Sequence, residues 1–383
     1  MSYSEAAIIT IFGVILPTGD VGSDYWLAGV LFLKDSPCLR QLDKRYLYGG
    51  ITLIFPMLSF AFTTHHWWQM ENPMKKGGPG RLKTLPLLLC QVWPQYRMIR
   101  ILYLGLVKKD PQWRRERKVM MENVSAVEPF IESVPQCFWI LSLGYLTDRC
   151  VGWSPAPGWD NGSIDGILSG WTNRSIDDIL GSCAFSTSVV SASYGLTNFL
   201  RVGPLKVIPN QPASGFGHPC FFLVFFSVLS SIVAKGILFG DFAYNGKVLY
   251  ACLGLFVPNM LLSLTSLLAT LGFKDSIILA IRHPPIVMMP VFTSFAFGPE
   301  RSNCKCQLGG KLRLHYGLTI SNLIITFIAG FGVFLLGQAE GPGLMLTLFL
   351  GLPLFVVSAL LTTVFILCDM CSFCSSCAPY VRG

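Results

Sequence analysis

The sequence predicts an all-α polytopic membrane protein with eight transmembrane helices plus two partly inserted (re-entrant) helices. Its residues are 52% hydrophobic and only 13% charged, whereas a soluble domain carries roughly 25% charged residues. The apolar residues are gathered into runs whose lengths approach the roughly 20 residues that a helix needs to cross the hydrocarbon core. Both observations exclude an ordinary soluble domain.

The predicted crossings are runs of mainly apolar residues, and they follow one another along the chain as 8–33, 47–68, 119–146, 176–200, 219–239, 248–272, 316–336 and 344–367. Two further apolar stretches, 85–107 and 286–297, are too short or too interrupted by proline and charge to cross. We expect both to dip into the membrane from one side, which is possible only where protein covers their free backbone groups.

The two short stretches occupy similar places in the two halves of the chain, because each follows an outside-to-inside crossing and precedes an inside-to-outside one. Internal repeats of this kind are common in transporter folds. The predicted organisation is an N-terminal repeat over 1–147, an extracellular loop over 148–178, a C-terminal repeat over 176–338, a last transmembrane helix over 344–367 and a cytosolic tail over 368–383.

Lysine and arginine are shared unequally between the predicted loops. With a cytosolic N-terminus, 21 of the 29 basic residues lie on the cytosolic side and seven outside, while Lys235 lies within a span. Because cytosolic loops carry an excess of such residues, we expect both termini in the cytosol. The outer loop also holds two glycosylation sequons, at Asn161 and Asn173, on the side where such sites are modified.

Two pairs of carboxylates fall at membrane depth. Asp20 and Asp24 lie in the first predicted span, and Glu128 and Glu132 lie in the third. Each pair is four residues apart, which places both acids on one face of a helix. Ionisable groups inside a membrane are costly and normally face a polar interior or a water-filled path. The pairs therefore predict a polar seam along which a lipid headgroup or an ion moves.

A structural alternative is that the acids are buried between helices, protonated or paired with Lys235 or Arg201, and stabilise the bundle. The predicted helix 176–200 has the same ambiguity, because small polar residues mark either a seam or close helix packing. Its small polar residues are Ser182, Ser186, Ser188, Ser191, Ser193, Thr197 and Asn198. Two carboxylate pairs on separate helices favour the seam.

The net charge of +8 comes from basic residues that gather in loops between apolar spans. This arrangement indicates anionic lipid headgroups as partners and no nucleic acid. The most basic loop, 70–118, is accounted for by cytosolic placement alone. Attraction of phosphatidylserine or phosphoinositide headgroups is a further possibility, at about 1 kcal/mol per basic residue near the surface.

Four cysteines recur at every third position directly after the last predicted span, at Cys368, Cys371, Cys374 and Cys377. Palmitoylation is the leading interpretation for clustered cytosolic cysteines beside a span, followed by free thiols and then by a metal site. Cys38 and Cys150 both lie outside in this topology, where a disulfide is possible.

The sequence has no phosphate-binding G-x-x-x-x-G-K-[ST] loop, and no Ser/His/Asp or Cys/His set stands out. We therefore expect neither an enzyme nor a cofactor.

Three segments resemble the XK-related family, which includes the Kell-associated blood-group protein and the apoptotic phospholipid scramblases. They are Gly19-Asp20-Val21 with Asp24, the run from Glu128 to Gln136 with its Glu-Ser-Val-Pro-Gln core, and Ser193-Tyr-Gly-Leu-Thr-Asn-Phe-Leu-Arg201. The resemblance covers essentially the whole chain in order and length. It implies eight crossings and two partly inserted helices in two repeats.

The resemblance also implies energy-independent scrambling in the plasma membrane that exposes phosphatidylserine. It places Asp20, Asp24, Glu128 and Glu132 along the lipid route and Arg201 near its cytosolic end. Asn198 stands where some relatives carry an acidic partner for the arginine.

The short tail lacks an Asp-x-x-Asp pattern, so caspase control is not predicted. Two alternatives to a scramblase remain. One is a non-transporting accessory or scaffold subunit of a single-span glycoprotein or a lipid-transfer protein. The other is an ion-coupled transporter of a small solute.

Overall fold

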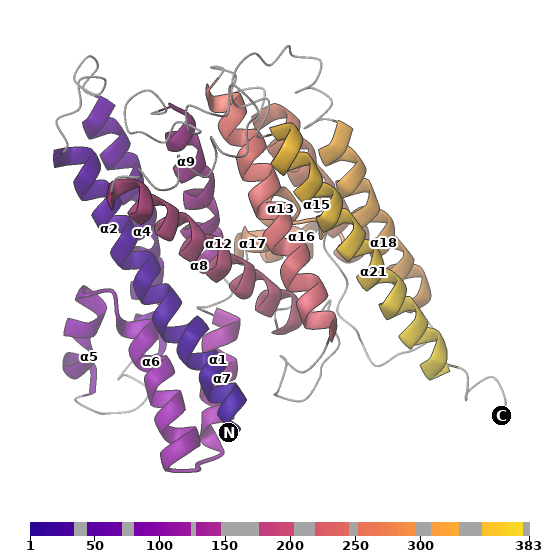
Figure 1. Cartoon of the computed structure of the whole chain (residues 1–383). Helices are drawn as coiled ribbons and strands as arrows, with labels where there is room; N and C mark the ends of the chain where they lie inside the picture. Colours follow the sequence, from indigo (N-terminus) through magenta and orange to yellow (C-terminus); the bar gives the residue numbers. More distant parts are fainter. Residues whose placement is uncertain are drawn as a thin grey trace. The chain divides into compact units, whose positions relative to one another are not determined.

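The computed structural model describes residues 1–33, 44–70, 80–123, 128–146, 176–202, 219–244, 252–282, 284–295, 308–328 and 347–377. Every regular element within these ranges is a helix (Figure 1), which confirms the predicted all-α class. The chain folds as two compact units, Met1–Gly203 and Pro204–Gly383. This division differs from the two predicted repeats, which stay a prediction.

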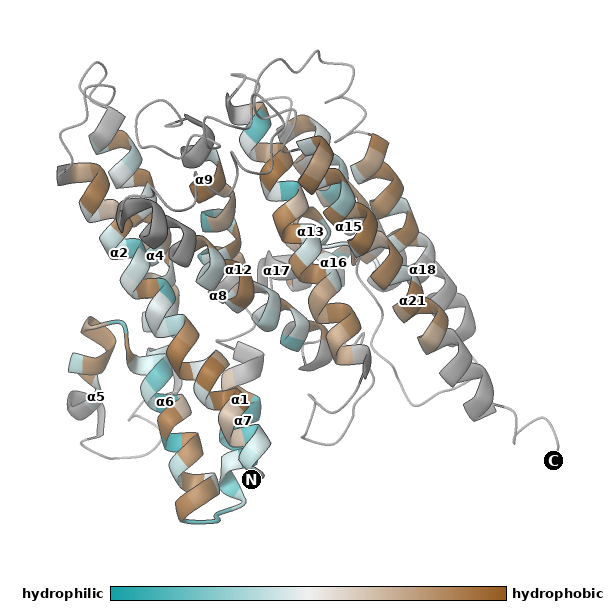
Figure 2. Cartoon of the chain, viewed as in Figure 1, coloured by the Kyte–Doolittle hydropathy of each residue, from teal (hydrophilic) through white to brown (hydrophobic). Residues whose placement is uncertain are grey.

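Four helical stretches in the described part of the chain are long and apolar enough to cross a membrane. They are Tyr3–Phe32, Tyr46–Trp68, Phe221–Phe242 and Thr347–Cys368. They coincide with the first, second, fifth and last of the predicted crossings, and the other four crossings stay predictions. Figure 2 shows the hydrophobic residues along these helices, and it shows that polar residues interrupt the helix nearest the N-terminus. The apolar helices are those of a membrane-associated protein.

The first unit begins with one long helical stretch made of α1 (Tyr3–Thr10), the π-helical segment η1 (Ile11–Ile15) and α2 (Leu16–Leu33). Ser2 starts it with a capping box: its hydroxyl accepts the Glu5 N–H, and the Glu5 carboxylate accepts the Ser2 N–H at 2.9 Å. Helix α2 packs against α4 (Lys44–Met70) and α12 (Ile176–Val202). These contacts place the middle of α2 inside the unit.

The stretch predicted to be re-entrant, 85–107, forms short helices. They are α5 (Gly80–Leu89), α6 (Trp93–Leu102) and the π-helical segment η3 (Tyr103–Val107). The chain breaks between α5 and α6 at Gln91, whose φ of 57° lies in the left-handed region. Neither α5 nor α6 is long enough to cross a bilayer, but entry into the membrane stays a prediction.

The third predicted crossing, 119–146, is interrupted in the described structure. Its parts are the end of α7 (Gln112–Asn123), the short α8 (Glu128–Ile131) and α9 (Ser133–Leu146). Residues 124–127 lie outside the described part of the chain. Helix α9 packs against α12 and α4, which fixes its first turn inside the unit.

The second unit is built on α13 (Pro219–Tyr244), which packs along α21 (Leu352–Cys377) and the preceding η8 (Thr347–Gly351). Ala234, Leu238, Phe242 and Phe355 form a buried core between them. The other helical segments of the unit are η6 (Cys252–Phe256), α15 (Val257–Leu271), α16 (Phe273–Arg282), α17 (Pro284–Phe292) and α18 (Leu308–Ile325).

Helix α17 corresponds to the second predicted re-entrant stretch, and it is short, with nine residues. Its C-terminal end is buried and bonded to polar side chains of neighbouring helices. The Lys235 ammonium donates to the carbonyls of Pro290 and Thr293, at 2.9 Å each. The Asn322 amide also donates to the Thr293 carbonyl, at 3.1 Å. Backbone groups released at the end of this helix are thereby satisfied within the unit, as apolar surroundings require.

Candidate functional site

Helix α2 buries its two aspartates on one face, as their spacing predicts. Asp20 is 4% exposed and Asp24 is fully buried. The opposite side of the helix is exposed at Thr18, Gly22 and Trp26. The acids therefore point into the first unit, where α12 packs against α2 and Ser133 of α9 bonds with Asp20.

The Asp20 carboxylate joins three helices through hydrogen bonds. Ser133 Oγ, at the start of α9, donates to Asp20 Oδ2 at 3.0 Å. The Ser188 hydroxyl, in the middle of α12, donates to Asp20 Oδ1. Both serines are buried. The polar face predicted for 176–200 thus meets the first acidic pair at Ser188.

Asp24 lies one turn further along α2 and is much less well satisfied. Neither of its carboxylate oxygens has a hydrogen-bond partner among the described residues. Its charged neighbours are Asp20 and Glu132, and Glu132 is itself 1% exposed. The Gln136 side chain lies close to Asp24, but neither of its amide atoms meets the geometry of a hydrogen bond.

Together these groups form an acidic cluster, defined here as Asp20, Asp24 and Glu132. Its immediate polar neighbours are Ser133, Gln136 and Ser188. Like charges in apolar surroundings repel one another, and an isolated buried carboxylate loses its hydration. The cluster is therefore an unfavourable arrangement for a purely structural element, and it presents acceptor atoms to any cationic or hydrogen-bonding group that reaches it.

Tyr25 connects the cluster to the surface of the unit. Its side chain is 37% exposed, yet it lies within electrostatic reach of Glu132 and Asp24 and hydrogen-bonds with the side chain of Gln91. Neither Tyr25 nor Gln91 was predicted from the sequence. The sequence signal near Gln91 was the interruption of the apolar stretch 85–107 by prolines. In the structure the helices of this stretch break at Gln91.

Other predicted residues lie apart from the cluster or outside the described structure. The Asn198 amide donates to the Tyr194 carbonyl of its own helix at 3.0 Å, so this residue shows no bond to the acids. Glu128 and Arg201 lie in α8 and α12, but their side chains are outside the description. Asn161 and Asn173, like Cys38 and Cys150, lie outside the described residues.

The cysteines after the last predicted span begin within helix α21, which continues to Cys377. Cys368 is a free, exposed thiol. The side chains of Cys371, Cys374 and Cys377 are not described. Among the described residues, no group of three or more His, Cys, Asp or Glu side chains is arranged to hold a metal ion. Palmitoylation of these cysteines stays a prediction.

The suggested pairing of the acids with Lys235 is replaced by a different arrangement. The described bonds of Lys235 are to backbone carbonyls at the end of α17, within the second unit. This ammonium therefore has a local role that sequence alone did not indicate.

The fold and the cluster define the class: an all-helical, membrane-associated protein with a buried acidic site. No family model matches the sequence, and no curated protein matches it. The resemblance to the XK-related family therefore stays a prediction.

Proposed function

We propose that the protein is an energy-independent phospholipid scramblase of the XK-related type, which moves phosphatidylserine and other lipids between leaflets. The observation that carries the proposal is the acidic cluster of Asp20, Asp24 and Glu132, buried on apolar helices with both Asp24 oxygens unpartnered among the described residues. Such groups at membrane depth normally serve a polar path.

The cluster would act by replacing part of the hydration that a headgroup loses in the membrane. The ammonium of phosphatidylserine or phosphatidylethanolamine has hydrogen-bond donors, as a lysine ammonium has. Asp24 and Glu132 would accept these bonds while the acyl chains remain in lipid. Because a charge at the bilayer centre is costly, such contacts lower the barrier to crossing. Lipid moves down its own gradient, so no energy source is needed.

The route would reach the cluster beside Tyr25, which is exposed while it lies close to Asp24 and Glu132. In the described conformation the cluster itself is buried, so we propose that this is the resting state. Lipid passage would require α2 to move away from α9 and α12. The hydrogen bonds that Ser133 and Ser188 donate to Asp20 would then exchange for bonds to the headgroup.

Purified protein in liposomes that contain fluorescent lipid tests the proposal, with dithionite bleaching as the readout and no ion gradient. Loss of one charge-assisted hydrogen bond costs about 1.5–3 kcal/mol, so D24N/E132Q should slow bleaching of the inner leaflet by roughly tenfold or more. D275N, which neutralises an exposed acid on α16, is the matched control. An equal rate in all three proteins would contradict a lipid route along the acidic cluster.

The same assay separates the alternatives. Inert vesicles together with a co-purifying single-span glycoprotein or lipid-transfer protein would favour an accessory subunit. Solute uptake that requires a proton or sodium gradient would favour a coupled transporter.

We further propose a plasma-membrane location, eight crossings and cytosolic termini. Support comes from the unequal distribution of basic residues and from four helical stretches that can span a membrane. Endoglycosidase treatment of N161Q and N173Q variants checks this topology. If neither site carries glycan and an engineered sequon in 70–118 does, the orientation is reversed.

A further inference from the structure

A row of exposed apolar side chains runs along α6 and η3. Tyr96, Ile99, Tyr103 and Val107 are between 37% and 67% exposed. Their spacings of three and four residues place them on one face of the helix. The opposite face is buried, with Met98 2% and Ile101 0% exposed. The first unit therefore covers only one side of this helix, and the apolar stripe faces outward.

The stripe ends at a cluster of exposed cations. Lys108 and Lys109 form the turn after η3, and Arg114 and Arg115 lie on the first turns of α7. Lys109 has a φ of 51°, a left-handed conformation that is uncommon for a residue other than glycine. All four side chains are exposed. The α6–α7 elbow, defined as residues 96–118, thus joins an apolar stripe to a cationic tip.

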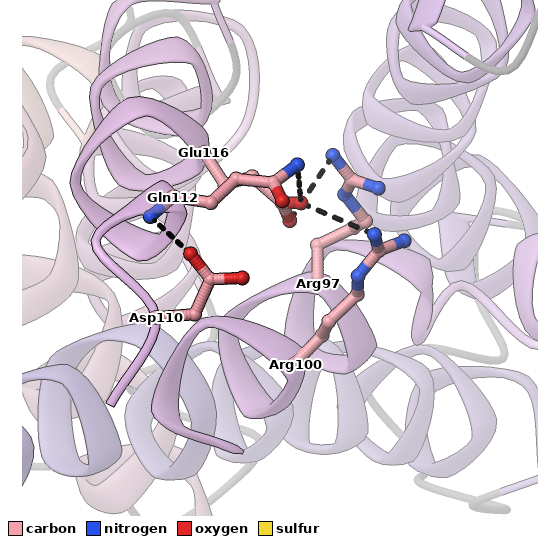
Figure 3. A network of polar contacts seen from close by, with 5 residues as sticks. All are labelled: Arg97, Arg100, Asp110, Gln112 and Glu116. Carbon is pink, nitrogen blue, oxygen red and sulfur yellow. Dashed lines mark hydrogen bonds and ion pairs between the residues drawn. The ribbon is translucent and has the colours of Figure 1, made fainter. Parts of the chain in front are cut away.

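The elbow contains two acids, and one of them, Glu116, is shared by two other arginines (Figure 3). Glu116 is buried, and its carboxylate pairs with Arg100 at 3.1 Å and with Arg97 at 3.7 Å. These pairs join α7 to α6 across the turn. Because Glu116 is already shared by two arginines, it does not neutralise the four exposed cations.

The other acid of the elbow has a structural role as well. Asp110 Oδ1 accepts the backbone N–H of Gln112 at 2.9 Å and so caps the start of α7 (Figure 3). Among the described residues, neither acid of the elbow forms an ion pair with the four exposed cations. The contacts of these cations are those of Lys108 with the Tyr103 ring and of Arg114 with the Trp113 ring.

We propose that the α6–α7 elbow binds the polyanionic headgroup of a phosphorylated inositol lipid at the membrane surface. Lys108, Lys109, Arg114 and Arg115 would contact its phosphates, since guanidinium groups match phosphate oxygens in paired hydrogen bonds. The acyl chains would lie along Tyr96, Ile99, Tyr103 and Val107.

Cytosolic placement of the loop explains why basic residues occur here, but it does not explain their arrangement. Topology depends on how many positive charges lie in short loops near the ends of the spans. It does not require the charges to gather at the end of an exposed apolar stripe on a turn held by buried ion pairs. Charge complementarity and the adjoining apolar surface together fit an anionic lipid. The elbow is separate from the acidic cluster, and the inference does not depend on the proposed scrambling.

Binding of dioctanoyl phosphatidylinositol 4,5-bisphosphate to the purified full-length protein in detergent tests the site, with microscale thermophoresis as the readout. A basic residue near a membrane surface contributes a factor of about five in affinity. R114Q/R115Q and, as a second variant, K108Q/K109Q should each weaken binding by roughly 25-fold. K274Q, which removes an exposed lysine on α16, should bind like the wild type, and dioctanoyl phosphatidylcholine should not compete.

A second comparison separates lipid recognition from simple phosphate binding. Free inositol 1,4,5-trisphosphate should bind more weakly than the short-chain lipid, and Y103S/V107S should weaken only the lipid. Equal affinity of the lipid for wild type, R114Q/R115Q and K108Q/K109Q would overturn the site. Equal affinity of the wild type for the free headgroup and the lipid would overturn the assignment to a lipid. All substituted side chains are exposed, and unchanged thermal unfolding confirms that the variants are folded.

Discussion

Replacing Asp24 by asparagine should stabilise the protein, although the residue is completely buried. Its carboxylate has no hydrogen-bond partner among the described residues and lies near Asp20 and Glu132. If the group is ionised, asparagine relieves both the lost hydration and the repulsion. If it is protonated in the folded protein, the carboxyl group ionises in water on unfolding, and this ionisation stabilises the unfolded chain. Asparagine abolishes that stabilisation of the unfolded state. Both charge states give the same sign.

The size of this stabilisation follows from a comparison of Asp24 with Asp20. Asp20 is buried to a similar degree but accepts hydrogen bonds from Ser133 and Ser188. An asparagine at position 20 keeps one acceptor oxygen and replaces the other by an NH2 donor. One serine must then turn its hydroxyl from donor to acceptor and loses its bond to a carboxylate oxygen, at a cost of about 1–3 kcal/mol. Asp24→Asn loses no such bond and should raise the free energy of unfolding by at least about 1 kcal/mol.

Thermal unfolding of the purified protein in detergent measures both effects. We expect Asp24→Asn to unfold at a higher temperature than the wild type and Asp20→Asn at a lower one, while Asp24→Asn also slows lipid bleaching. A variant that is more stable but less active identifies a site kept for function at a cost in stability. If Asp24→Asn is destabilised as much as Asp20→Asn, the acids act as structural links between helices and the proposed function loses its support.

Three further substitutions test contacts within one unit or the other. Thermal unfolding of each variant is compared with that of the wild type. Glu116→Gln weakens the nearly buried pair with Arg97 and the pair with the half-exposed Arg100. It should cost about 2–4 kcal/mol, whereas a loss below about 0.5 kcal/mol would show that Arg97 is satisfied elsewhere. Lys235→Met leaves the Pro290 carbonyl without its 2.9 Å donor and should cost about 1–3 kcal/mol; full stability would mean that water replaces the ammonium. Gly351→Leu places a side chain where even a Cβ approaches an isoleucine methyl group of α13 at 3.3 Å, so it should cost about 1–3 kcal/mol by overpacking, and no change would indicate that η8 moves aside.

The predicted resemblance to the XK-related family and the acidic cluster both support the proposed function. The resemblance rests on short acidic segments and on the order of hydrophobic runs. The cluster rests on the burial of its three acids and on the two Asp24 oxygens, which have no hydrogen-bond partner among the described residues. Lipid bleaching by the purified protein and binding at the α6–α7 elbow are separate measurements, so failure of one leaves the other interpretable.

The sequence by itself determined the helical class and part of the membrane character. Apolar runs near the thickness of a bilayer form helices because every backbone group must be bonded within the segment, and four of the predicted crossings coincide with such helices. Helical periodicity also determined that Asp20 and Asp24 share a face. These properties are local, since they depend on residues within a few turns of one another.

The tertiary structure decided which distant residues meet. Asp20 bonds with Ser133 and Ser188, which are 113 and 168 residues away, and no periodicity within one helix specifies such a meeting. The same holds for Lys235, whose ammonium bonds with carbonyls at the end of α17. Pairing between segments depends on how side chains of several helices fill the space between them, so the partners of a buried polar group follow from packing.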